Sequence, residues 1–441
     1  MSKIDSQHFW DLMDALPVDA IPKIESELLR RVQQIYRVES NTLFFDTTNF
    51  FSYIDTTNIR CTIAQRGKNK QKRNDLRQIG LALVVTKEHL IPLFHLTYKG
   101  NRNDTVVFKT IASKLKERIL ELGLELNKHT LVFDRGNNSK KNIGILEKLG
   151  FYYVGALTPY HHKKLIEEAE NNFGILSVGE NRMMVYRDKR IIWGEDRTVI
   201  VYISEGLKAG QLRGIYQSIT KKIKELKIIQ KSLSNSGGKR RNRLHLEEKI
   251  KDIVKGQYLK DIIEWSLKEG SEGKLQLDFN INIKNLNEIE DKLGFRILMT
   301  NRHNWSTEEI IKTYWGQADI ENAFKNLKNP YHLTLKPQFH WTDQKIIVHY
   351  FICVLGFLLT AIIWREVKIK INYKSCIDTL LDTLNNIRLT TLLEKSTTPG
   401  RVKAEYKLEE MTEEENMIMQ ALEIMNIHNN RPKLYGVGIY N

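Results

Sequence analysis

Cysteine is scarce in this sequence, with only Cys61, Cys353 and Cys376 among 441 residues and no C-x-x-C pair. A disulfide framework or a cysteine-rich zinc site needs clustered cysteines, so the sequence favours neither. This usage is typical of a reducing cytoplasm. The first residues also lack the apolar segment of a signal peptide, and we therefore expect a cytoplasmic protein.

Other familiar patterns are missing as well. No G-x-x-x-x-G-K-[ST] motif occurs, which argues against a phosphate-binding loop at Gly67 and Lys68. No internal repeat or low-complexity tract is present. The only run approaching the length of a bilayer span is residues 346–364. In a chain so rich in charge we expect a buried core helix there; a membrane anchor is the alternative, which solubility without detergent would exclude.

Acidic residues are outnumbered. The chain has 68 Lys and Arg against 53 Asp and Glu, a net charge of +15, which points to a polyanionic partner such as nucleic acid or an acidic membrane surface. The densest basic stretch is residues 66–77. Such a run is often only a solvated loop, but in this chain its cations are candidate contacts to DNA phosphates. The candidates are Arg66, Lys68, Lys70 and Arg73.

The first part of the chain has the pattern of an α/β domain. Helical spacing in residues 1–40 is followed by strands at about 42–52, 78–86 and 90–98, a helix at 104–122, a strand at 130–134, a helix at 139–149 and a strand at 151–157. Right-handed, short crossovers can place the first and fourth strands side by side. Asp46 and Asp134 would then be neighbours on a mixed sheet.

The next part breaks this rhythm. After residue 160 come short strand-like segments, two helices predicted at 210–233 and 245–268, and an alternating strand at 274–283. We expect an inserted subdomain here. Near the C-terminus the pattern predicts a helix at 375–393, a strand at 401–410 and a final helix beginning near Thr412.

A polar helix follows the insertion. Ser306 with Glu309 three residues later forms a capping box at its start. Residues 314–328 then have helical spacing, with one polar face beside an apolar one. Taken alone, this is an ordinary amphipathic helix. Its polar face carries Tyr314, Gln317, Glu321, Lys325 and Lys328.

Asp46, Asp134 and Glu321 together would form a cluster of hard oxygen ligands. Three neighbouring carboxylates repel one another, so the cluster requires cations. We expect two Mg²⁺ or Mn²⁺ ions, which at about 3.5–4 Å separation assist phosphodiester displacement. Each aspartate alone is more simply a strand-end residue; the three together in a basic chain favour the metal site. The hydroxyl of Tyr314, the amide of Gln317 and the ammonium groups of Lys325 and Lys328 suit phosphate contacts.

The segments FFDTTNFF, LVFDRGNNS and Y-x-x-Q-x-x-x-E-x-x-F-K-x-L-K resemble the catalytic blocks of DDE transposases of the bacterial insertion-sequence-four family. The likeness extends from about His8 to Trp364. It implies an α/β fold with an RNase-H-like mixed five-stranded sheet, flanking helices and an inserted β-rich and helical subdomain. It also implies a metal-binding catalytic triad of Asp46, Asp134 and Glu321, with Tyr314, Gln317, Glu321 and Lys328 at the positions of the family's Tyr-Arg-Glu-Lys signature.

The resemblance further implies a metal-dependent DNA transposase, acting as an endonuclease and polynucleotidyl transferase in DNA recombination. It would nick double-stranded DNA at the ends of an insertion element and transfer the strand to target DNA, as a homodimer in a synaptic complex near the bacterial nucleoid, with no membrane role. Some relatives form a DNA hairpin in which a tryptophan of the inserted domain grips a flipped base. Trp193, Trp265 and Trp305 are equal candidates for such a role.

From these patterns we divide the chain into five parts. They are an N-terminal helical segment (1–40), the first part of the core (41–160), the inserted subdomain (161–295), the second part of the core with the catalytic helix (296–365) and a C-terminal helical segment (366–441).

Two features depart from the family pattern. Gln317 stands where the signature has Arg, which removes a cation with bidentate reach to phosphate. Only 45 residues precede Asp46, so we expect a shortened copy with a reduced region for recognising element ends. The alternative function is therefore a truncated, catalytically silent DNA-binding remnant.

Overall fold

The computed structural model describes residues 6–55, 57–69, 71–234, 242–269, 275–333, 335, 340–394 and 403–426. Within it the chain forms two compact units. The first unit comprises Met1–Gly155 and Thr300–Asn441, and the second comprises Ala156–Met299. The predicted boundaries of the inserted subdomain, 161–295, remain a prediction.

The first unit is built on a mixed sheet, and its fold is RNase-H-like, as expected. The strands lie in the order β4-β3-β1-β5-β6, and the short β2 also pairs with β3. β3 runs antiparallel to β1 and β4, whereas β1, β5 and β6 are parallel. The strands are β1 (Thr42–Ser52), β2 (Gln65–Arg66), β3 (Arg77–Thr86), β4 (Pro92–Lys99), β5 (Thr130–Phe133) and β6 (Tyr152–Leu157).

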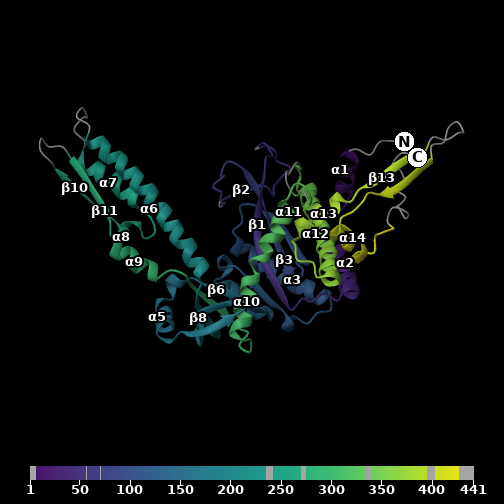
Figure 1. The fold of residues 1–441 in the computed structure, drawn as a ribbon, viewed down its shortest axis with the longest axis horizontal. Helices are drawn as coiled ribbons and strands as arrows, with labels where there is room; N and C mark the ends of the chain where they lie inside the picture. The colour runs from purple at the N-terminus through teal and green to yellow at the C-terminus, as the bar shows by residue number, and fades with distance from the viewer. Residues whose placement is uncertain are drawn as a thin grey trace. The chain divides into compact units, whose positions relative to one another are not determined.

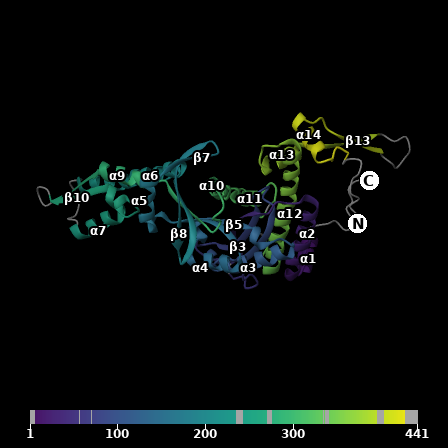
Figure 2. The same ribbon diagram turned by 90° about the horizontal axis from the view of Figure 1, so that it is seen from below.

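Helices cover both faces of this sheet. Figure 2 shows α3 and α4 on one side of the strands and α10 and α11 on the other. α3 approaches through Phe108, whose ring lies 5.5 Å from that of Phe45 on β1. The helices of the first unit are α1 (Ser6–Ala15), α2 (Ile21–Tyr36), α3 (Asp104–Glu121), α4 (Lys140–Leu149), α10 (Thr307–Gly316), α11 (Asp319–Lys328), α12 (Asp343–Ile371), α13 (Ile377–Asn386) and α14 (Glu413–Ala421), with short 3-10 turns η1 (Val18–Ala20), η2 (Leu126–Lys128) and η3 (Arg135–Asn137).

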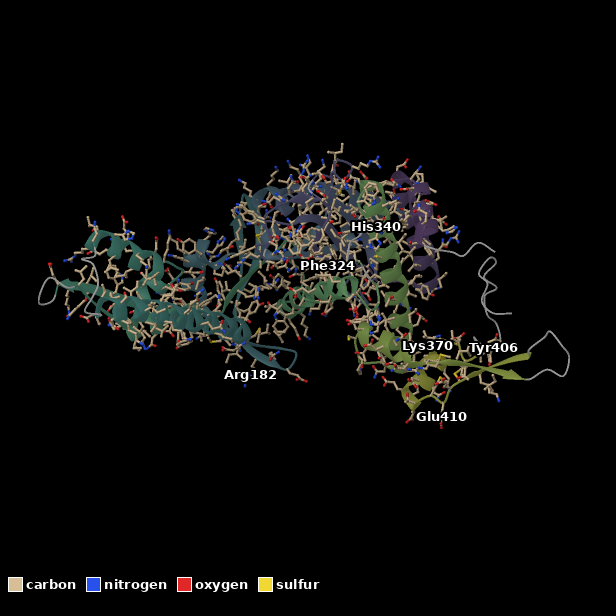
Figure 3. All side chains as sticks on the ribbon, turned by 90° about the horizontal axis from the view of Figure 1, so that it is seen from above. Arg182, Phe324, His340, Lys370, Tyr406 and Glu410 are labelled. Carbon is tan, nitrogen blue, oxygen red and sulfur yellow. The ribbon has the colours of Figure 1, made fainter. Side chains whose placement is uncertain are left out.

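The long apolar run lies in α12. It is the one helix of the described residues that is long and apolar enough to cross a membrane, a test that core helices of soluble proteins also pass. It packs against α1, α11, α13, α14 and β4, and 56% of its most apolar stretch is buried. Near its end, Lys370, labelled in Figure 3, donates a hydrogen bond to the carbonyl oxygen of Ala421 at 2.8 Å. The predicted core helix is therefore present.

The second unit contains a sheet, in which β7, β8 and β9 are antiparallel, and a helical part. The sheet has the order β12-β9-β8-β7. The helices α6 and α7 pack beside the hairpin of β10 and β11 (Figure 1). The elements are α5 (Lys163–Asn172), β7 (Gly174–Val178), β8 (Asn181–Ile192), β9 (Glu195–Ile203), α6 (Glu205–Ser234), α7 (Arg243–Val254), α8 (Leu259–Ile262), β10 (Ile263–Glu269), β11 (Leu275–Ile281), α9 (Ile283–Asp291), β12 (Phe295–Thr300) and η4 (Pro159–His161).

Three predicted helices were wrong in extent. The helix at 245–268 ends at Val254, and Ile263–Glu269 forms β10, because Trp265 pairs with Phe279 of β11. The helix at 375–393 is α13 followed by β13 (Leu389–Glu394), which pairs with β14 (Lys403–Leu408). The C-terminal segment is thus not purely helical. The third, at 314–328, is divided in two and belongs to the site.

Candidate active site

Asp46 and Asp134 lie at corresponding positions of two neighbouring strands. In the parallel pair of β1 and β5, Phe45 is level with Phe133, and each phenylalanine is followed by an aspartate. Both phenylalanine rings are fully buried and contact Phe108 of α3. Because side chains alternate along extended backbone, the two aspartates project from the opposite face of the sheet. The predicted adjacency of these strands is confirmed.

The α10–α11 segment runs along that same face of β1. Phe44, Asp46, Thr48 and Phe50 share the face by alternation. At one end, a Cβ on Gly316 would lie 2.7 Å from Cζ of Phe44. At the other, Lys328 Nζ donates a 2.6 Å hydrogen bond to Thr48 Oγ1. The helices therefore follow β1 in its own direction.

The spacing of these two contacts predicts where Glu321 lies. From Gly316 to Lys328 the chain rises by about 18 Å at helical pitch, and from Phe44 to Thr48 by about 13 Å in a strand, a difference that the long Lys328 side chain can span. Glu321, five residues after Gly316, is about 7.5 Å along, and Asp46, two residues after Phe44, is about 7 Å along. Glu321 and Lys328 are seven residues apart and so share one side of α11. Glu321 therefore lies on the side of α11 that carries Lys328, and its position level with Asp46 stays a prediction.

The helix predicted across 314–328 is interrupted. α10 ends at Gly316 and α11 begins at Asp319, and the junction is held by bonds that span three residues, such as Ile320 N to Gln317 O at 3.3 Å. Such tight turns are typical of functional hinges and strained segments. The single polar face predicted from Tyr314 to Lys328 is therefore wrong in part. The capping box of Ser306 and Glu309 is confirmed.

The predicted phosphate contacts differ in exposure. Tyr314 is 6% exposed and belongs to the core, Gln317 is half-buried at the helix junction, and Lys325 is exposed and lies 3.4 Å from the amide oxygen of Asn322. Lys328 is half-buried, and besides Thr48 it lies over Phe50 and over Phe324, the buried α11 residue labelled in Figure 3. The hydrogen bond to Thr48 orients Lys328 onto β1, and the roles of all four residues toward DNA stay predictions.

The basic loop is only partly available to DNA. Arg66 lies in β2, and it and Lys68 are exposed. Arg73 forms a salt bridge with Asp75 at 2.7 Å, which holds the pKa of Asp75 below its usual value. Lys70 lies outside the described residues.

The carboxylates suit a divalent cation by chemistry and access. Asp134 and Glu321 are exposed, and neither side chain has a hydrogen bond or ion pair with another described residue. Hard carboxylate oxygens are the ligands that Mg²⁺ and Mn²⁺ prefer. Among the described residues, no three His, Cys, Asp or Glu side chains lie close enough to hold a metal ion. The pairing of β1 with β5 makes Asp46 and Asp134 neighbours, and the approach of Glu321 to them at ligand distance stays a prediction.

Sequence reasoning missed Asn137. It lies in the turn after β5, where its backbone N–H bonds the carbonyl of Asp134 at 3.0 Å. It is 4% exposed, and its side-chain oxygen has no hydrogen-bond partner within the described residues. A buried, unpaired amide oxygen is costly and marks a site worth attention. The run of Gly136, Asn137 and Asn138 was the available signal.

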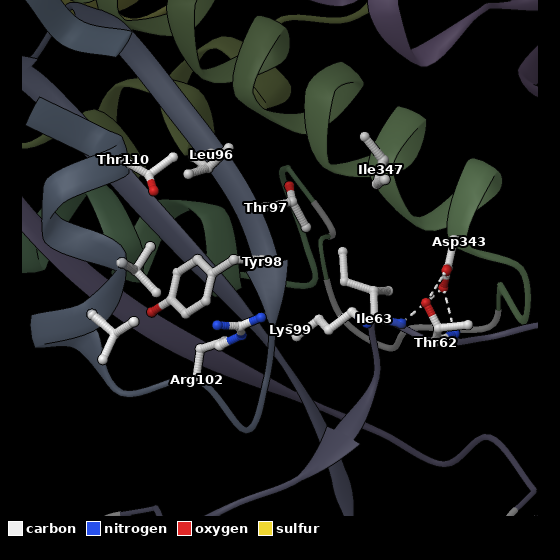
Figure 4. A pocket seen from close by; sticks show the side chains of 12 residues that line it. Thr62, Ile63, Leu96, Thr97, Tyr98, Lys99, Arg102, Thr110, Asp343 and Ile347 are labelled. Atoms are coloured by element: carbon white, nitrogen blue, oxygen red, sulfur yellow. Dashed lines mark hydrogen bonds between the residues drawn. The ribbon is translucent and has the colours of Figure 1, made fainter. Parts of the chain in front are cut away.

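A separate pocket of about 460 Å³ opens beside β4. Figure 4 shows Asp343 of α12 accepting hydrogen bonds from Thr62, whose N–H and hydroxyl lie 2.7 and 2.6 Å away. Lys99 and Arg102 lie on the other side of this pocket (Figure 4). None of the three carboxylates lines it, so it is distinct from the candidate active site.

A family model described as "Transposase DDE domain" matches residues 51–337. This chain belongs to the DDE transposase family. The matched span includes Asp134 and Glu321 and begins within β1, after Asp46. No curated protein matches the chain. Membership implies a transposase function, DNA as the partner and dependence on divalent metal, as in the family's polynucleotidyl transferases.

Proposed function

We propose that this chain is the transposase of an insertion-sequence-four type element, which nicks double-stranded DNA at the element ends and joins them to target DNA. The observation that supports the proposal is the register of β1 and β5, which pairs Phe45 with Phe133, the residues directly before Asp46 and Asp134. Family membership and the path of α11 along β1 also support it.

The reaction consists of two displacements at phosphorus. In the first, water attacks the phosphodiester at the element boundary, and the P–O3′ bond breaks to leave a free 3′-hydroxyl and a 5′-phosphate. In the second, that hydroxyl attacks a target phosphodiester, forming a new P–O bond and releasing the target's 3′-hydroxyl. Bonds formed and broken balance in each step, so neither requires an oxidant or a nucleotide cofactor.

We assign the carboxylates of Asp46, Asp134 and Glu321 to hold two Mg²⁺ or Mn²⁺ ions. When bound, such ions activate the attacking oxygen and stabilise charge on the leaving oxygen. Lys328, fixed by Thr48, holds its ammonium group close to the carboxylate face, where it can bind a non-bridging phosphate oxygen. Two copies of the chain, one on each element end, would form the synaptic complex.

The test is incubation of the purified protein with supercoiled plasmid carrying the element ends, with Mg²⁺ or Mn²⁺ and with EDTA. We expect metal-dependent nicks at the boundary, and their loss in Asp46→Asn, Asp134→Asn and Glu321→Gln. Asp319→Asn is the matched control. Asp319 is on α11 two residues from Glu321, but the charged groups that act on it are Lys368 and Glu88 and not the candidate carboxylates. It should nick normally.

The outcomes separate the candidate functions. Full nicking by any triad variant would refute the assignment of that carboxylate. Tight binding of element ends with no nicking under either metal would favour the catalytically silent DNA-binding remnant.

A further inference from the structure

Helix α6 in the second unit has two opposite faces. One is apolar and buried: Ile215, Ile219, Leu226 and Ile229 pack in a cluster with Leu246 and Ile250 of α7 and with residues of β10 and β11. These four positions follow the helical period, so this face is fully used in holding the second unit together.

The opposite face carries a stripe of cations, each one exposed. At 100° per residue the stripe lies within an arc of about 120° centred opposite the buried face. We call this set the α6 basic stripe. Its members are Arg213, Lys221, Lys224, Lys227 and Lys231.

The stripe is not neutralised. None of its five cations has an ion pair or hydrogen bond with another described residue. The acidic residues of α6 are Glu205 and Glu225, and Glu225 is paired with Lys222 on the flank at 3.2 Å. Glu290 of α9 accepts a hydrogen bond of 2.7 Å from the hydroxyl of Tyr216. A solvated helix face ordinarily mixes both charge signs at i,i+4 spacing, so five cations without an acid indicate an anionic partner.

The dimensions fit an extended polyanion. From Arg213 to Lys231 the helix rises by about 27 Å, with the four lysines roughly one turn apart and Arg213 about two turns before the first of them. Double-stranded DNA carries one phosphate per about 1.7 Å of axis, a continuous line of charge over that length. Gln217 and Thr220 line a shallow depression between Arg213 and Lys224 and add polar groups that suit phosphate oxygens.

We propose that the α6 basic stripe is a second DNA-binding surface, which holds the phosphate backbone of a duplex independently of sequence. The choice of DNA among polyanions rests on the proposed function. A membrane surface fits less well, because an interfacial helix inserts its apolar face and that of α6 is already buried.

The test compares two full-length variants that lose the same charge. The stripe variant changes Arg213, Lys221, Lys224, Lys227 and Lys231 to Gln. The control variant changes five other exposed lysines of the second unit to Gln: Lys249, Lys251, Lys255, Lys260 and Lys284. All ten side chains are exposed, so both variants should fold, which circular dichroism and thermal melts would verify.

The measurement is the affinity for a random duplex of about 30 base pairs across a salt series in EDTA. Each phosphate contact contributes about −0.9 to the slope of log K against log salt. We expect the stripe variant to lose about 4 from the magnitude of that slope and the control variant less than about 1. Equal slopes in the two variants would overturn the proposal.

The design separates this inference from the proposed function. Binding in EDTA needs no cleavage, so a protein that never nicks still tests the stripe. Conversely, normal nicking with an unchanged slope in the stripe variant would refute the stripe alone. Binding to phosphatidylserine vesicles that depends on the stripe, with DNA binding unaffected, would reassign the surface to an acidic membrane and overturn the proposal.

Discussion

Lys328 donates a hydrogen bond of 2.6 Å to Thr48, two residues beyond Asp46 on the same face of β1. This contact fixes a long, flexible side chain from α11 on the strand that bears the first carboxylate. It thereby connects a helix and a strand that are far apart in the sequence, and it makes the ammonium group part of the candidate active site.

The first prediction concerns this contact. Lys328→Met keeps the length of the side chain but removes its charge, and we expect the nicking rate to fall by about 10- to 100-fold, the scale of losing one charge-stabilising donor. Thr48→Val keeps the charge of Lys328 but removes the hydrogen bond that holds its ammonium group. The loss of nicking activity should therefore be smaller and should appear chiefly as a higher KM. Nicking of supercoiled plasmid checks both, and wild-type rates in Lys328→Met would remove Lys328 from the mechanism.

The second prediction concerns the close approach of α10 to β1. Gly316→Ala places a methyl group 2.7 Å from the Phe44 ring, so we expect a loss of about 1–3 kcal/mol in the free energy of unfolding. Combining Gly316→Ala with Phe44→Leu should restore part of the lost free energy of unfolding. A double-mutant cycle measured by denaturant unfolding would show this.

Gly214→Ala is the matched control for that substitution. Gly214 lies in α6, and nothing lies within 4 Å of a Cβ placed there. Because Ala is the better helix former, this variant should gain about 0.5–1 kcal/mol. A destabilised Gly214→Ala, or a neutral Gly316→Ala, would contradict the packing described.

The third prediction concerns a buried ionic cluster between α2, β4 and α3. Glu25 bonds His95 at 2.5 Å and Arg118 at 3.0 Å. Burial alone would raise the pKa of Glu25, but the charges and hydrogen bonds of His95 and Arg118 lower it below its usual value. Its stabilising effect is therefore present above about pH 4.5 and is lost as the pH falls through the lowered folded pKa.

Removing the Glu25 carboxylate takes the nearest acid from the buried His95 and Arg118, although Arg118 keeps Glu121 at 3.5 Å. Glu25→Gln should cost about 3–5 kcal/mol at pH 7, measured by urea unfolding. Glu27→Gln is the control, because Glu27 is exposed and, in the part of the chain that the structure describes, pairs with just Arg30 and Arg31. It should change stability by less than about 1 kcal/mol. Similar effects in the two variants would show that the cluster contributes no more than a surface pair.

The fourth prediction concerns pH and His349 of α12. Burial, followed by the neighbouring His340, lowers the pKa of His349 to about 4. The unfolded chain therefore binds the proton more tightly than the folded one between pH 6.5 and 4, and stability falls as the pH falls through that range. Over the whole window this is about 3 kcal/mol.

His349→Leu should flatten this dependence, measured as the free energy of unfolding at pH 7 and pH 5. The exposed His303 gives the control, and His303→Gln should keep the dependence. An unchanged slope in His349→Leu would assign the pH response to other groups.

Strong local patterns allowed the sheet of the first unit to be predicted. β1 and β3 are apolar, rich in β-branched or aromatic residues and bounded by turns, and the order of strands and helices constrains which strands are neighbours. The adjacency of Asp46 and Asp134 followed from that order. It needed no knowledge of side-chain packing.

What could not be predicted depends on partners distant in the chain. Residues 263–269 fit a helical period, and only their pairing with β11 makes them a strand. The junction after Gly316 is fitted against Phe44, and the Lys328 bond depends on Thr48, so neither has a local signal. Asn137 was overlooked because its burial is a property of the folded turn.

The order of the three carboxylates along the chain has a consequence for protein synthesis. The ribosome makes Asp46 and Asp134 early, but Glu321 appears only after the whole second unit, Ala156–Met299, has been made. No growing chain that stops before α11 contains all three groups. With the carboxylates assigned as we propose, a chain still being translated would lack its third metal ligand until the second unit had been made, so DNA cleavage would begin only after α11 is complete.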